Sequence, residues 1–224
     1  MVLPLLTVLL LIYSACGAKI LSIFHVPSFS HQQVGLKLVY ELAARGHDVT
    51  AIIPKDYAPK HKIKNLNVVE LNSDELKKEL KDAFRRSSQG IIHNIVHVEF
   101  TGLLFAEETL RQSNVRNLLK SNQTFELVLM DDFFNAAFRG FCYHFKAHCV
   151  ISSVYRASRW SNLQMGNHNF PSYVPEPLLN NPSTMNFWQR LTNTYAYLFG
   201  LLFFKFLHFA EAQRNASKVF SKRL

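Results

Sequence analysis

One pair of ionisable residues in the sequence has a placement that suits base catalysis. His31 follows the apolar run 19–25, and Asp131 follows the apolar run 126–130. An aspartate that accepts a hydrogen bond from one imidazole nitrogen leaves the other nitrogen free to take a proton from a hydroxyl group. We expect His31 to lie at the start of a helix, where the charged imidazolium form is disfavoured. His31 and Asp131 are therefore the candidate catalytic residues.

Both residues also have ordinary structural interpretations, which the sequence leaves open. The chain has ten histidines, and a histidine near a helix start is most often exposed or a capping residue. An acidic residue after a strand commonly caps the next helix. If Asp132 has that role, Asp131 is free to pair with His31. His93 and His97 are four residues apart and could share a metal ion on one helical face. No HExxH motif or third ligand accompanies them, so we expect no metal site.

The glycines exclude the best-known nucleotide-binding motifs. The 8 glycines are never closer than 11 positions, so neither GxGxxG nor GxxxxGK[ST] is present. G-x-S-x-G is also missing, which leaves serine nucleophile chemistry without support. Classical dinucleotide-binding and P-loop functions are therefore excluded.

Positive charge is concentrated in the second part of the chain. The formal net charge is +9, and residues 133–224 contain 10 basic and 2 acidic side chains. Such a segment could face anionic lipid, a phosphate-bearing ligand or nucleic acid. The basic residues form no block, and the aromatic residues lie in apolar runs instead of among them, so we expect no nucleic-acid partner.

Residues 1–18 have the features of a secretory signal peptide: no charge, a central apolar run and small residues at the end. We expect cleavage before Lys19, with an uncleaved N-terminal anchor as the alternative. In the secretory pathway, the two N-x-[ST] sequons at Asn122 and Asn215 are candidate sites of N-glycosylation.

Cys142 and Cys149 remain after removal of the signal peptide. They could pair in an oxidising lumen, because disulfides persist in that environment. Cys142 falls in a predicted helix and Cys149 in a predicted strand core, however, so buried free thiols are the default expectation.

The elements that must position His31 and Asp131 alternate between strands and helices. Apolar runs predict strands at 19–25, 48–54, 67–71, 126–130 and 148–152. Helical spacing predicts helices from Ser30 as N-cap to Gly46, and over 74–86, most of 91–120 and 133–145. This alternation predicts an α/β fold with a doubly wound parallel sheet. Ligands of such sheets bind beyond the carboxyl ends of the strands, where His31 and Asp131 lie.

Two apolar segments have open interpretations. The aromatic series that begins at Phe133 and Phe134 is most often a helix core face, although its first members flank Asp131 and could form a pocket for a lipophilic substrate. Residues 195–209 are the most hydrophobic stretch after the signal peptide, but they are short for a membrane span and include Lys205. We expect the helix over 188–209 to pack on the domain or to lie partly buried in a bilayer surface.

Several segments together resemble the membrane-bound UDP-glycosyltransferases of animals, and particularly their insect members. They are PSFSHQQVGLKLVYELAARGHDVT, FELVLMDDFFNAA, MGNHNFPSYVPEPLL and MNFWQRLTNTYAYL. The resemblance runs over nearly the whole chain. It implies that residues 19–224 form the N-terminal, acceptor-binding Rossmann-like half of a GT-B fold.

The resemblance places the family's catalytic histidine on His31 and its partner carboxylate on Asp131. His31 would deprotonate a hydroxyl of a small lipophilic acceptor, which would then attack the anomeric carbon of a UDP-sugar with inversion. The co-substrate would be UDP-glucose or UDP-glucuronate, without a further cofactor. Four residues would bind the acceptor: Phe29, Ser30, Phe133 and Phe134.

The resemblance also assigns donor binding and the membrane anchor to residues outside this chain. We therefore expect the chain alone to bind no nucleotide sugar tightly and to lack glycosyl transfer. The resemblance implies that the protein lies in the lumen of the endoplasmic reticulum and is associated with its membrane. It also implies a glycoprotein with a role in detoxification, which could form homo- or hetero-oligomers. The rival hypothesis is a noncatalytic lumenal protein that binds lipophilic molecules or pairs with full-length relatives.

Overall fold

The structure is a computed structural model of the chain. It describes residues 17–86, 91–133, 135–154, 159–167, 169–176, 179–203 and 205–206. Four sequence predictions lie wholly or partly outside the described residues: the signal peptide up to residue 16, the acceptor residue Phe134, the end of the helix over 188–209 and the sequon at Asn215.

Five parallel strands form the central sheet, as the sequence predicts. They are β1 (Lys19–Ile23), β2 (Asp48–Pro54), β3 (Leu66–Leu71), β4 (Leu127–Asp131) and β5 (His148–Ser152). Their order in the sheet is β3-β2-β1-β4-β5, and each of the four strand pairings is parallel. Along the chain, β2 and β3 are added on one side of β1, and β4 and β5 are then added on its other side. This reversal places the carboxyl ends of β1 and β4 next to each other, at the position where doubly wound sheets bind ligands.

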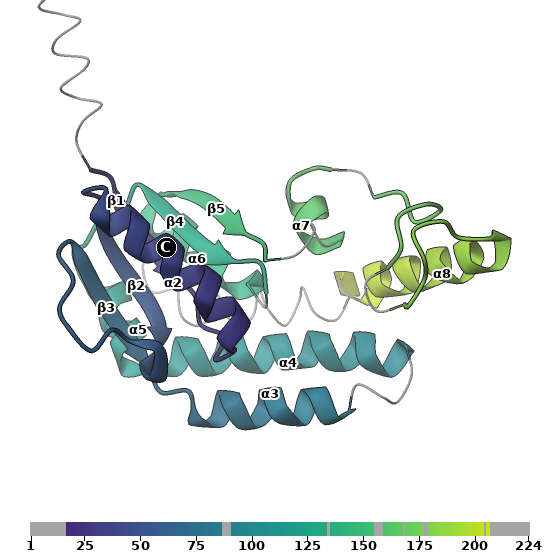
Figure 1. The fold of residues 1–224 in the computed structure, drawn as a ribbon, viewed down its shortest axis with the longest axis horizontal. Coiled ribbons are helices and arrows are strands. Elements are labelled where there is room, and N and C mark those ends of the chain that lie inside the picture. The colour runs from purple at the N-terminus through teal and green to yellow at the C-terminus, as the bar shows by residue number, and fades with distance from the viewer. Residues whose placement is uncertain are drawn as a thin grey trace, which may run out of the picture.

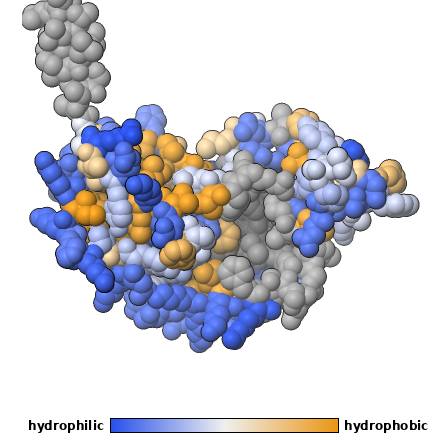
Figure 2. Space-filling view, viewed as in Figure 1, coloured by the Kyte–Doolittle hydropathy of each residue, from blue (hydrophilic) through white to orange (hydrophobic). Residues whose placement is uncertain are grey.

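Helices cover both faces of the sheet (Figure 1). They are α2 (Phe29–Ala44), α3 (Asp74–Arg86), α4 (Ile91–Arg111), α5 (Ser113–Lys120), α6 (Arg139–Phe145), α7 (Arg159–Gln164) and α8 (Phe187–Phe203), with short 3-10 turns η1 (Lys55–Tyr57) and η2 (Ala136–Phe138). Side chains along β1 point alternately to opposite faces: Ile20, and Phe24 just after the strand, pack with α2, whereas Leu21 and Ile23 pack with α4, α5 and α6. The charged helix α3 forms a hydrophilic rim (Figure 2).

Helix α2 differs from the prediction at its first residue. It begins at Phe29, and its N-cap is Ser28 with extended backbone, so the prediction that Ser30 caps the helix is wrong. The two hydroxyls lie within 3.2 Å of each other, and neither binds the helix backbone as a cap. The predicted end is confirmed, because Gly46 has a φ of 91°, a conformation that suits glycine.

Close packing of α2 on β1 depends on Gly35. A Cβ atom added at Gly35 would lie 2.4 Å from the ring of Phe24. The absent side chain therefore lets the helix approach the strand, and this contact fixes the height of the helix above the sheet.

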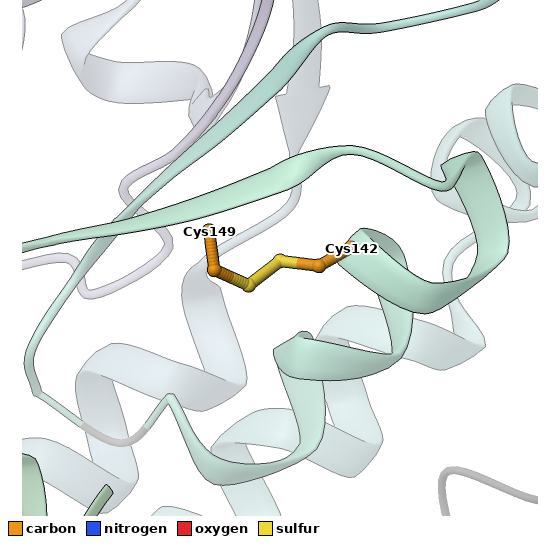
Figure 3. Close-up of a disulfide and its surroundings, with 2 residues drawn as sticks. All are labelled: Cys142 and Cys149. Carbon is orange, nitrogen blue, oxygen red and sulfur yellow. A yellow bond between two sulfur atoms is a disulfide. The ribbon is translucent and has the colours of Figure 1, made fainter. Parts of the chain in front are cut away.

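Cys142 and Cys149 form a disulfide between α6 and β5, with their Cα atoms 5.8 Å apart (Figure 3). The expectation of free thiols is therefore wrong. Helix α6 ends at Phe145, and the chain turns through Lys146, whose backbone is left-handed with φ of 53°. This turn brings β5 back beside α6, so residues seven apart in sequence meet across the helix–strand junction.

Helix α8 lies at the end of the molecule away from β3 (Figure 1). It contacts α4, where the rings of Phe100 and Phe203 meet at 6.2 Å between centroids. Its observed bounds are Phe187–Phe203, so the helix begins one residue before the predicted range 188–209. Within the described part of the chain, no helix combines the length and the apolar character that crossing a bilayer requires.

Candidate active site

The structure brings the two predicted catalytic residues together. The His31 Nδ1 atom lies 2.6 Å from Asp131 Oδ2, and the side chains are 12% and 1% exposed. His31 is in the first turn of α2, directly after the β1 loop, and Asp131 is the last residue of β4. They meet because β1 and β4 are neighbouring parallel strands whose carboxyl ends lie at the same edge of the sheet.

The hydrogen bond defines which imidazole nitrogen is available for chemistry. A carboxylate can only accept, so the proton lies on His31 Nδ1 and the Nε2 atom keeps its lone pair. Within the described residues, Nε2 has no hydrogen-bond partner. The second Asp131 oxygen accepts from the backbone N–H of Phe133 at 3.4 Å, which helps to hold the carboxylate in place. An imidazole held in this way can act as a general base toward a hydroxyl that approaches Nε2.

Gln32, the residue after His31, secures the loop that leads into the site. Its side chain is fully buried, and its amide nitrogen donates to the carbonyl oxygens of Phe24 and Val26, each at 2.7 Å. The loop backbone between β1 and α2 is therefore tied to the helix turn that carries His31. Sequence reasoning missed this residue, because a glutamine on an amphipathic helix gives no sign that it faces inward.

His25 is a second histidine in the same loop, and its surroundings make it a packing residue. It is fully buried against the edges of Phe105 and Phe138, and the described part of the chain offers neither ring nitrogen a hydrogen-bond partner. Burial lowers the pKa of the His25 imidazole to about 3, and the nearby His31 adds to this effect. His25 therefore stays neutral at physiological pH and is poorly suited to act as a base.

Asp132 does not cap the following helix, so that prediction is wrong. The N-caps of η2 and α6 are Asn135 and Phe138. Asp132 instead accepts hydrogen bonds from the hydroxyls of Ser153 and Ser161 at 3.2 and 3.1 Å. Burial raises the pKa of the Asp132 carboxyl, and the two hydroxyls oppose this effect. Asp132 thus connects the end of β4 to α7 and to the segment after β5.

The predicted acceptor residues have different environments. Phe133 is half-buried, and its ring lies 4.9 Å from the His31 ring between centroids. Phe29 is 68% exposed at the start of α2, and Ser30 is also exposed. Phe138 and Phe141, further along the aromatic series, belong to the core and confirm its interpretation as a packing face.

Two other groups of polar side chains lie away from the His31 pair. His93 and His97 are adjacent on α4 with ring centroids 5.7 Å apart, and the described residues contain no group of three potential metal ligands. A polar pocket of about 700 Å³ lies beyond β2 and β3 and does not include His31 or Asp131. Its lining residues bind one another, for example where the Gln112 amide pairs with both backbone groups of Asn72 at 2.8 Å. The His31 pair therefore remains the candidate active site.

The parallel sheet, with a His–Asp pair beyond the ends of its two central strands, defines an α/β protein of the Rossmann-like class. The family model of UDP-glucoronosyl and UDP-glucosyl transferases matches residues 18–223. The chain belongs to this UDP-glycosyltransferase family, which confirms the resemblance seen in the sequence.

Relatives with known names match the chain over part of their own length. The chain is 25% identical to UDP-glucosyltransferase 2 of Dactylopius coccus over 223 residues, which covers 91% of this chain and 40% of that protein. It is 30% identical to the ecdysteroid UDP-glucosyltransferase of Autographa californica nuclear polyhedrosis virus over 52% of this chain and 25% of that protein. Among solved structures, the calicheamicin glycosyltransferase CalG4 matches with a TM-score of 0.45 and 19% identity, covering 83% of this chain and 41% of that one. The chain thus spans less than half the length of these relatives.

Proposed function

We propose that this chain forms the acceptor-binding part of a UDP-glycosyltransferase and that His31 is its general base. The observation that carries the proposal is the 2.6 Å hydrogen bond between His31 Nδ1 and the buried carboxylate of Asp131. Family membership supports the reaction class, and the geometry supports the roles of the two residues.

In the proposed reaction, His31 Nε2 removes the proton from an acceptor hydroxyl. The oxygen attacks the anomeric carbon of the sugar while the bond from that carbon to the UDP phosphate oxygen breaks. This single displacement inverts the anomeric configuration, and UDP leaves with the bonding electrons. The imidazolium that forms is stabilised by Asp131, whose carboxylate is already in contact with Nδ1.

The proposed acceptor is a small lipophilic molecule that carries a hydroxyl. Phe133 lies against the His31 ring, and the exposed ring of Phe29 stands two residues before His31. Aromatic side chains around a few polar groups are typical of sites for such ligands. The relatives named ecdysteroid UDP-glucosyltransferases add support, because a steroid is a molecule of this class. Phe134 and Ser30 complete the proposed set of acceptor residues.

We propose that the sugar donor is held mainly by a second Rossmann-like half, in a GT-B arrangement, as part of a longer protein. The matched relatives are more than twice the length of the aligned region, and their names favour UDP-glucose over UDP-glucuronate. The proposed location is the lumen of the endoplasmic reticulum. The disulfide between Cys142 and Cys149 supports an oxidising compartment of this kind.

A chimera tests the proposal. The donor-binding half of the Dactylopius coccus relative is joined after Leu224, and transfer from UDP-glucose to hydroxylated lipophilic acceptors is measured. His31→Ala should lower turnover by about 10²- to 10⁴-fold, the usual contribution of a general base. Asp131→Asn should also lower turnover, because the charge that stabilises the imidazolium is lost. The double variant should be little worse than His31→Ala, because the aspartate acts through the histidine.

Asp132→Asn is the matched control. An asparagine oxygen can still accept from Ser153 and Ser161, so turnover should stay close to that of the unmodified chimera. Near-normal turnover of a folded His31→Ala chimera would show that the assigned roles are wrong. Tight binding of the acceptors without turnover in any chimera would favour the rival, noncatalytic function.

A further inference from the structure

The turn between β4 and α6 contains two buried hydrogen-bond donors that lack a partner. Asn135 is 5% exposed, and its amide nitrogen Nδ2 has no hydrogen-bond partner among the described residues. The same is true of the buried Nε atom of Arg139, the first residue of α6. Buried donors in folded proteins are nearly always paired, so two unpaired donors in one turn need an explanation.

The described neighbours do not account for the two donors. Asn135 is the N-cap of η2, but its side chain makes no capping hydrogen bond. The Asp132 carboxylate accepts from the hydroxyls of Ser153 and Ser161. It acts on Arg139 only through its charge. The two donors are therefore available to another molecule.

The two donors lie close together, and one of them belongs to a charged group. Asn135 and Arg139 are four residues apart along helical backbone, so their Cα atoms are about 6 to 9 Å apart. Burial lowers the pKa of the Arg139 guanidinium, and the charge of Asp132 opposes this effect. A guanidinium stays protonated in proteins, and its N–H groups match the two oxygens of a carboxylate. Arg139 is only half-buried, so a ligand can reach it from solvent.

The turn continues directly from the proposed active site. Asp131, which holds His31, lies four residues before Asn135, so their Cα atoms are at most about 15 Å apart. Phe133 lies between them in sequence, and its ring is 4.9 Å from the His31 ring between centroids. The chain thus presents the base, an aromatic side chain and the unpaired donors in that order. A ligand that uses all three carries a hydroxyl, an apolar body and an anionic group.

We propose that Asn135 and Arg139 form an acceptor subsite that binds a carboxylate and so selects lipophilic hydroxy acids over neutral alcohols. This inference rests on the proposed function, because it places the hydroxyl of the same ligand at His31. The carboxylate would accept from the Arg139 guanidinium and from the Asn135 amide, and both donors would gain the partner that they lack. The diphosphate of UDP offers oxygens of the same chemistry, so the test includes UDP.

Isothermal titration calorimetry of the full chain at pH 7.5 compares ω-hydroxydodecanoic acid with its methyl ester and with dodecanol. The ionised acid should bind at least about tenfold more tightly than the ester or the alcohol, because charge-assisted hydrogen bonds are stronger than neutral ones. Arg139→Gln should remove most of this preference and change the affinity for the ester less than about twofold, because glutamine keeps a neutral donor but no charge. UDP should bind weakly, and equally weakly to Arg139→Gln.

Arg45→Gln is the matched control, because it removes the same charge from an exposed arginine at the end of α2 away from His31. It should leave the preference for the acid unchanged. Asn135→Leu is a second variant, in which an apolar side chain of similar volume replaces the unpaired amide. The urea midpoint of this variant should not decrease, whereas its affinity for the acid should fall.

Equal affinities for the acid and the alcohol, an unchanged preference in Arg139→Gln, or an equal loss in Arg45→Gln would overturn the proposal. A decrease in UDP binding by Arg139→Gln, without a change for the acid, would identify the diphosphate as the ligand and overturn it as well. A lower urea midpoint of Asn135→Leu would assign the amide a structural role and remove it from the subsite. These affinities do not depend on glycosyl transfer, which the chimera measures, so the inference and the proposed function can fail separately.

Discussion

His25 should make the stability of this domain fall steeply in mild acid. Its imidazole is fully buried between aromatic rings and has no hydrogen-bond partner among the described residues, so the native state excludes the charged form. Its pKa is about 3 in the folded chain, compared with 6.5 for an imidazole in the unfolded chain. Below pH 6.5 the unfolded state therefore binds one more proton than the folded state, and each proton bound favours unfolding.

The size of the effect follows from the two pKa values. Between pH 6.5 and 3, the free energy of unfolding should decrease by about 1.4 kcal/mol per pH unit because of His25 alone. The stabilisation is fully present above pH 6.5 and is lost as the pH falls toward 3. Between pH 7.5 and 5.0 the expected loss is about 2 kcal/mol, a substantial part of the stability of a typical domain.

Urea unfolding at pH 7.5 and 5.0 measures this contribution when the wild type is compared with His25→Leu. The substitution changes stability at both pH values, but the decrease between them should be about 2 kcal/mol smaller than in the wild type. His25→Gln provides a second variant that cannot be protonated in this range. His61→Gln removes an exposed histidine and should leave the decrease unchanged. An equal decrease in the wild type and in both His25 variants would refute the reasoning.

Three further changes test other features of the fold. Gly35→Ala should destabilise the domain by up to about 2 kcal/mol in urea unfolding, because overpacking against the Phe24 ring exceeds the gain in helix propensity. Replacement of Cys142 and Cys149 by Ser should lower the free energy of unfolding by about 2.5 kcal/mol, because the disulfide closes a loop over a separation of seven residues and so restricts the unfolded chain. Urea unfolding of the wild type in reductant should show the same decrease. Asn122 lies in an exposed loop after α5, so Asn122→Gln should remove one glycan and increase gel mobility after expression in a secretory host.

The sheet and the His31–Asp131 pair could be predicted because they depend on local patterns. Short apolar runs separated by helical stretches determine a parallel sheet, and a parallel sheet places residues that follow neighbouring strands at one edge. His31 and Asp131 are 100 positions apart in sequence, yet this rule alone brings them into contact. The prediction needed no knowledge of side-chain packing.

The remaining features depend on contacts that local sequence does not encode. Asp132 follows a strand, as a capping residue does, but hydroxyls from α7 and the segment after β5 lie close enough to bind it. The cysteines pair because a left-handed turn at Lys146 returns the chain beside α6. His25 has the sequence context of a loop residue, and its burial follows from the packing of α4 and η2 over the loop.

The hydrogen bonds of Gln32 fix the loop before α2, whereas Phe29, the first residue of α2, is under a different evolutionary constraint. The backbone at Phe24 and Val26 is anchored by the buried amide, so its path does not depend on the side chains that follow. Phe29 extends into solvent beyond this anchor. Mutations at Phe29 can therefore change the surface offered to the proposed acceptor while the distance from His31 to Asp131 stays fixed. Under the proposed function, ligand choice and proton transfer would respond to different mutations, so new acceptors could arise while the general base is kept.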